Sequence, residues 1–162
     1  MGELKQVAVL FALPKSVYFA LDGCDVWDSK RDARNYPGGM PVVAHPPCRT
    51  WGIMRAFCHA PPEESALSLV AVDMVRANGG VLEHPFHSKL WDAVPLPQPG
   101  QLDRWGGYTM PILQFWFGHR APKATLLYIV GCPPKDLPLI PFKLGLAPCV
   151  VSTRKKVNPA PE

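Results

Sequence analysis

The chain has 162 residues, of which 48% are hydrophobic and 19% are charged, a balance that excludes a disordered chain and fits one globular domain. The net charge of +4 permits an anionic partner such as a nucleotide or nucleic acid but does not demand one. No apolar run approaches the roughly 20 residues of a membrane helix, and five irregularly spaced cysteines without a signal peptide predict free thiols in the cytoplasm.

The first third of the chain predicts three strands. Residues 7–12 (VAVLFA) form a continuous apolar run of strand length. A short helix over residues 16–21 and a second strand over residues 24–27, ending at Asp28, are expected next. A polar connection rich in glycine and proline then leads to a third strand at residues 41–44.

The clearest helix is predicted over residues 63–77. Apolar side chains recur there at helical spacing from Leu67 to Val75, and Gly79 follows the end of the pattern. A short strand at residues 81–83 comes next. Residues 41–83 therefore predict a βαβ unit with two parallel, neighbouring strands and a right-handed crossover.

The second half of the chain is harder to assign. Residues 85–122 are rich in tryptophan, proline and glycine and are predicted to form active-site loops. Residues 124–130 (ATLLYIV) predict another strand. We therefore predict a single α/β domain over residues 1–150, built as a small, three-layer, mostly parallel sheet, with a basic, proline-containing and solvated tail at residues 151–162.

Two reactive side chains are predicted to meet at one edge of this sheet. Cys48 follows the third strand on a turn stiffened by Pro46 and Pro47, and Glu83 lies at the carboxyl end of the neighbouring strand. A thiol beside a carboxyl group suits covalent addition to an electron-poor ring. The alternative is that Cys48 is an inert, buried small side chain.

Three short motifs occur in order along the chain: His45-Pro46-Pro47-Cys48, Val81-Leu82-Glu83-His84, and residues 118–123 (GHRAPK) before the last strand. In this order and spacing the chain resembles the DNA cytosine-5 methyltransferases, as a minimal relative of the kind that phage genomes carry. The resemblance implies that Cys48 attacks C6 of a cytosine, that Glu83 engages its N3 and amino group, and that Arg120 or Lys123 holds the ring carbonyl. It also implies a partial class I methyltransferase (Rossmann-like) sheet.

The resemblance further implies a substrate pocket and, conditionally, an S-adenosylmethionine site. Beside the catalytic pair, the expected substrate-binding residues are His45, Pro47, Arg49, Trp51 and His84, with Arg120 and Lys123. The expected cofactor-binding residues are Phe11, Asp28 and Asp32.

Two other functions stay open. No glycine lies between Gly2 and Gly23, where a cofactor loop is expected, so a non-catalytic module that binds a nucleotide or a base, or that blocks a host factor, is the first alternative. A zinc-dependent hydrolase is the minority alternative, because soft ligands gather in the central region without any CxxC pair. These ligands are Cys48, Cys58, His59, His84, His87 and His119.

Overall fold

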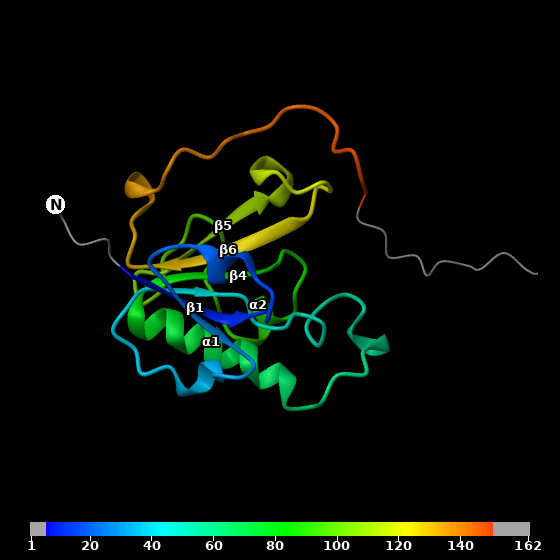
Figure 1. Cartoon of the computed structure of the whole chain (residues 1–162). Helices are drawn as coiled ribbons and strands as arrows, with labels where there is room; N and C mark the ends of the chain where they lie inside the picture. The colour runs from blue at the N-terminus through cyan, green and yellow to red at the C-terminus, as the bar shows by residue number, and fades with distance from the viewer. Residues whose placement is uncertain (1–5, 151–162) are drawn as a thin grey trace, which may run out of the picture.

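The protein is built around one six-stranded sheet with the strand order β2-β1-β3-β4-β6-β5 (Figure 1). The computed structural model describes residues 6–150. The tail predicted at residues 151–162 lies outside the described residues. Among the residues that are described, no helix is long and apolar enough to cross a membrane.

Four neighbouring strands of the six run parallel, and they form the part of the sheet that positions the candidate site. The chain runs from β1 (Val7–Ala12) outward to β2 (Cys24–Asp28) and then returns to β3 (Val42–Ala44) on the other side of β1. The carboxyl ends of β1 and β3 therefore flank a topological switch point, where open parallel sheets leave a crevice. β4 (Gly80–Pro85) pairs in parallel with β3.

The predicted βαβ unit is confirmed. α1 (Glu64–Asn78) connects β3 to β4, and these strands pair from Val42↔Gly80 to Ala44↔Leu82. A side chain at Gly80 would place its Cβ 2.0 Å from the carbonyl oxygen of Val42, and the φ of Gly80 is +113°. Only glycine fits this close approach of two backbones.

Two antiparallel strands complete the sheet. β6 (Ala124–Val130) pairs antiparallel with β4 on one side and with β5 (Tyr108–Leu113) on the other. The sequence predicted β6 but assigned β5 to a loop. The same region also contains the short helix α2 (Leu90–Ala93) and the 3-10 helix η4 (Gln114–Phe117).

The main core lies between the sheet and α1, which buries Ala71, Val72 and Val75 against the strands. The opposite face carries a smaller apolar group, which includes Val9 and Val26 and is covered by the 3-10 helix η1 (Val17–Ala20). The segment after β6 passes on the side of the sheet away from α1 (Figure 1). An α/β class is confirmed, but residues 6–150 contain no second long helix, so the predicted three-layer arrangement is corrected to one helical layer on a mixed sheet.

Candidate active site

The carboxyl ends of β3 and β4 bring His45 and Glu83 together. Since Ala44 pairs with Leu82, the next residue of each strand reaches the same point of the rim. The backbone N–H of His45 donates to the carbonyl of Leu10 at 3.1 Å, which extends the β1–β3 pairing by one residue. The Nδ1 of His45 lies 3.5 Å from Oε2 of Glu83.

Glu83 is held by donors from the antiparallel half of the sheet. Gln114 Nε2 donates to Oε1 at 2.8 Å, Thr125 Oγ1 lies 3.4 Å from the same oxygen, and Lys123 Nζ lies 3.7 Å from it. Burial alone would raise the pKa of Glu83, but the contact with His45 and the charge of Lys123 outweigh it and lower that pKa overall. Glu83 is therefore a carboxylate at neutral pH, able to accept hydrogen bonds.

Tyr18 completes a chain of polar groups through His45. Its hydroxyl lies 3.0 Å from Nε2 of His45, and the two rings stack with centroids 5.6 Å apart. With the Tyr18 hydroxyl donating to Nε2, the proton on Nδ1 faces Glu83. Both nitrogens of His45 are thus engaged, and the ring is fixed in orientation.

Cys48 lies in a turn that is tied to its surroundings at several points. The carbonyl of Pro47 accepts from Ser68 Oγ of α1 at 3.2 Å, and the carbonyl of Cys48 accepts from the N–H of Trp51 at 3.1 Å. The thiol is half-buried. Burial raises the pKa of the Cys48 thiol, and the opposing charge of Lys123 does not offset that rise. The resting thiol is therefore protonated at neutral pH.

Two hollows meet at Lys123. The carboxylate cavity, about 650 Å³, is lined by Tyr18, His45, Glu83, Gln114, His119 and Lys123, with Ile112 and Phe117. The thiol cavity, about 870 Å³, is lined by Cys48, Lys123 and mostly apolar side chains that include Ile53, Met54 and Phe57. The ammonium group of Lys123 thus stands between the thiol and the carboxylate.

A third hollow, called here the switch-point cavity, has a volume of about 340 Å³ and is lined by all three residues that were predicted to bind a cofactor. Phe11, Asp28 and Asp32 line it together with Pro47 from the Cys48 turn. Phe11 has a φ of +62°, so the backbone takes at this point the left-handed bend that glycine usually supplies. The volume lies in the usual range of ligand pockets, about 300–1,000 Å³.

The two acidic residues of this cavity differ in how much of each carboxylate is free. Asp28 is buried, and its Oδ1 accepts from the backbone N–H groups of Lys30 and Arg31, whereas its Oδ2 accepts no hydrogen bond from the described residues. Asp32 is engaged by the guanidinium of Arg34 through both of its oxygens. Asp28 therefore keeps one carboxylate oxygen free to accept a hydrogen bond from a ligand in this cavity, whereas both oxygens of Asp32 are already paired.

Four residues expected to bind substrate lie elsewhere or are already engaged. His84 has no exposed surface and packs edge-on against Trp91, on the α1 face of the sheet, so it does not line the rim cavities. Trp51 donates its indole N–H to the carbonyl of Ser65 and packs on the main core. Arg49 borders the thiol cavity but is paired with Glu64. The side chain of Arg120 is exposed and lines none of these three cavities.

The sequence did not indicate Tyr18, Gln114 or Thr125 as site residues. Thr125 and Gln114 reach Glu83 only because β6 pairs antiparallel with β4, a pairing that no local motif signals. Within residues 6–150, no group of three or more His, Cys, Asp or Glu side chains converges as a metal site would require. All five cysteines are free thiols.

No protein-family model, curated protein or solved structure matches this chain. By its fold and its site, the protein is a small α/β domain with cavities at the carboxyl ends of its parallel strands, lined in part by polar side chains.

Proposed function

We propose that the protein modifies a pyrimidine base, with cytosine in a nucleic acid or a nucleotide as the substrate. The observation that carries the proposal is the arrangement of Cys48 and Glu83 on either side of Lys123, in two cavities that meet at that lysine. A thiol, a carboxylate and an ammonium group are what covalent activation of a pyrimidine ring requires: a nucleophile, an acceptor for the amino group and a donor for the ring carbonyl.

In the proposed reaction the Cys48 thiol gives its proton to solvent water, the resulting thiolate forms a bond to C6, and the electron pair of the C5–C6 double bond becomes available at C5. Glu83 acts as a hydrogen-bond acceptor for the exocyclic amino group, since its lowered pKa keeps it ionised. Lys123 donates to the ring carbonyl and stabilises the negative charge that develops there. His45 and Gln114 hold Glu83 in place and act as positioning residues.

S-adenosylmethionine would supply a methyl group to the activated C5. Loss of the C5 proton to water and departure of the Cys48 thiolate would then restore the C5–C6 double bond and free the cysteine. The residues that would hold it are Phe11, Asp28 and Asp32 in the switch-point cavity, which shares Pro47 with the Cys48 turn. Four parallel strands whose order reverses at β1, joined to the antiparallel strand β6, agree with a partial class I methyltransferase sheet. Five free thiols agree with a reducing compartment such as the cytoplasm.

The test is transfer of a labelled methyl group from S-adenosylmethionine to an oligonucleotide that contains cytosine. Cys48→Ser and Glu83→Gln should each abolish transfer, because one removes the nucleophile and the other replaces the carboxylate with an amide that presents a donor. Cys58→Ser is the matched control, since Cys58 lines the same cavity and is half-buried like Cys48. Equal transfer by Cys48→Ser and the unchanged protein would overturn the proposal.

One observation favours a second candidate, a module that binds a base without reacting with it. Burial raises the pKa of Cys48, and both nitrogens of the nearby His45 are engaged, so neither ring nitrogen is free to take the thiol proton. A calorimetric titration with S-adenosylmethionine separates the two candidates. Saturable binding of S-adenosylmethionine that is weakened by Asp28→Asn would support the enzyme. Binding of a nucleotide without any binding of S-adenosylmethionine would support the non-catalytic module.

A further inference from the structure

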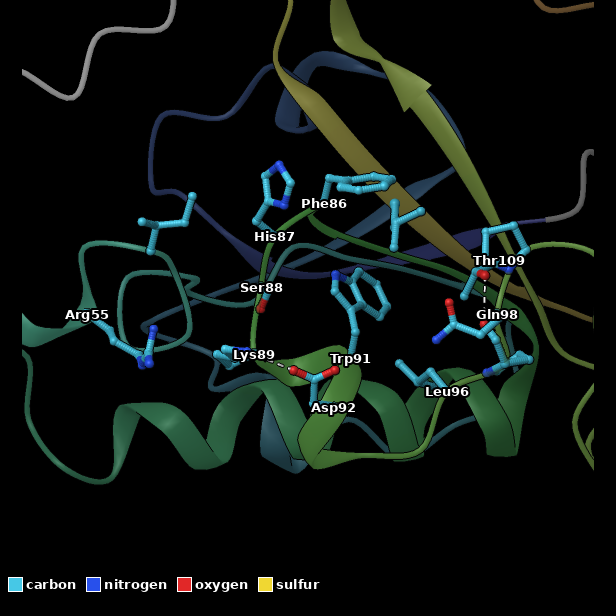
Figure 2. A pocket seen from close by; sticks show the side chains of 14 residues that line it. Arg55, Phe86, His87, Ser88, Lys89, Trp91, Asp92, Leu96, Gln98 and Thr109 are labelled. Carbon is cyan, nitrogen blue, oxygen red and sulfur yellow. Dashed lines mark hydrogen bonds and ion pairs between the residues drawn. The ribbon is translucent and has the colours of Figure 1, made fainter.

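A fourth hollow lies beside the end of β4 and is shown in Figure 2. This hollow, called here the flanking cavity, has a volume of about 560 Å³. Its lining combines basic, aromatic and amide side chains, chiefly Arg55, His87, Lys89, Phe86, Trp91 and Gln98. In Figure 2, Phe86 and His87 lie on one side of the hollow, Lys89 and Asp92 lie on the other, and Trp91 lies between them.

The flanking cavity adjoins the candidate active site. It shares Ile53, Phe86 and His87 with the thiol cavity, which in turn meets the carboxylate cavity at Lys123. Three hollows therefore follow one another along the rim, and Cys48 lines the middle one. Phe86 and His87 therefore border both the cavity that holds Cys48 and the flanking cavity beside it.

The aromatic part of this lining is free to contact a ligand. Phe86 is 41% exposed although it is a large apolar side chain. Trp91, in contrast, is mostly buried, and its indole N–H is used by the carbonyl of Pro85. Phe86, whose ring meets the ring of His87 at nearly a right angle, is therefore the exposed aromatic side chain that a planar group can contact. Base stacking on exposed aromatic side chains is the usual means of holding unpaired bases.

The charged part of the lining favours an anion. Arg55 is exposed and forms no ion pair with the described residues. Lys89 is paired with Asp92 at 3.1 Å, but both side chains are solvated, and such surface pairs are weak enough for a phosphate to replace the carboxylate. Gln98 adds an amide that both donates and accepts hydrogen bonds, as recognition of a base edge requires.

We propose that the flanking cavity holds the nucleotide next to the target pyrimidine in a single-stranded polynucleotide. The neighbouring base stacks on Phe86, and its phosphate lies against Arg55 and Lys89. This inference rests on the proposed function and narrows its substrate from a nucleotide or a nucleic acid to an unpaired strand. A duplex does not fit this role, because its own neighbouring bases cover the face that Phe86 needs.

The test compares three probes on the full chain: deoxycytidine monophosphate, a fluorescein-labelled single strand of about 12 nucleotides with one cytosine in a thymine tract, and the duplex of that strand. The single strand should bind more tightly than the monophosphate and more tightly than the duplex. Phe86→Ala should weaken strand binding roughly 5- to 150-fold, as expected for one lost stacking contact, and should weaken monophosphate binding by a smaller factor. Arg55→Ala should lower the slope of log affinity against log salt by about 0.7.

Phe19→Ala and Lys30→Ala are the matched controls, because each removes an exposed ring or charge outside the four cavities. Equal affinities for the strand and the monophosphate, equal affinities for the strand and its duplex, or unchanged strand binding in both Phe86→Ala and Arg55→Ala would overturn the inference. Since Arg55 is exposed and lies in the short 3-10 helix Arg55–Phe57, its variant stays informative even if Phe86→Ala fails to fold. If the proposed function is wrong and this inference holds, the result is different: Cys48→Ser leaves methyl transfer unchanged, whereas Phe86→Ala still weakens strand binding.

Discussion

His84 should make the stability of the protein fall as the pH drops below neutral. Its side chain has no exposed surface, neither ring nitrogen has a hydrogen-bond partner among the described residues, and one edge of the ring faces Trp91. Burial lowers the pKa of His84 to about 4, against 6.5 for the exposed group. The folded protein therefore resists protonation of this imidazole, whereas the unfolded chain accepts the proton readily.

The sign and size of the effect follow from these two values. The contribution of His84 to the free energy of unfolding is complete above pH 6.5 and is lost as the pH falls from 6.5 toward 4. A difference of about 2.5 between the two pKa values corresponds to about 3 kcal/mol. Glu83, whose pKa is lowered, acts in the same direction only below its ordinary value of 4.5, so the interval between pH 6.5 and 5 isolates His84.

The assay is urea unfolding between pH 7 and pH 5. His84→Leu, which replaces the imidazole with an apolar side chain, should remove most of the loss of stability over this interval. His59→Leu is the control, because His59 is exposed and should leave the pH dependence as it is. If His84→Leu loses stability with falling pH as steeply as the unchanged protein, the buried, unpartnered imidazole is not the cause and the reasoning is wrong.

Three further predictions concern the sheet and the site. Gly80→Ala should unfold the protein or lower its free energy of unfolding in urea by more than about 3 kcal/mol, since the added Cβ would collide with Val42. A decrease of less than about 1 kcal/mol would contradict this. Alkylation of Cys48 by iodoacetamide should accelerate about tenfold per pH unit from pH 7 to 8, and Lys123→Gln should slow it at pH 8, because Lys123 lowers the pKa of the thiol; equal rates in both proteins would contradict the contact. Asp28→Asn should weaken S-adenosylmethionine binding measured by calorimetry, and an unchanged affinity would remove Asp28 from the cofactor site.

The parallel half of the sheet was predictable because each part of it carries a local signal. The apolar runs at residues 7–12 and 41–44 have strand length, and the apolar pattern from Leu67 to Val75 has helical spacing. The crossover rule then predicts that β3 lies beside β4, so that Cys48 and Glu83 lie at the same rim of the sheet. The antiparallel half has no such signal, so β5 and the contacts of Gln114 with Glu83 required the structure.

His84 lies on the opposite face of β4 from Glu83, and the alternation of side chains along a strand explains this placement. Successive side chains of a strand point to opposite faces, so His84 cannot share the environment of Glu83. His84 instead shares the face of Leu82, which is packed beneath α1. The environment of His84 therefore follows from the two-residue period of β4 and not from its proximity in sequence to Glu83.

Trapping on a 5-fluorocytosine oligonucleotide tests the central claim most directly. Incubated with S-adenosylmethionine, the protein should form a covalent complex visible in the intact mass, and peptide mapping should locate the base on Cys48. Cys58→Ser should form the complex, and Cys48→Ser should not. No complex with the folded protein, or a complex that persists in Cys48→Ser, would contradict the assignment of Cys48 as the nucleophile.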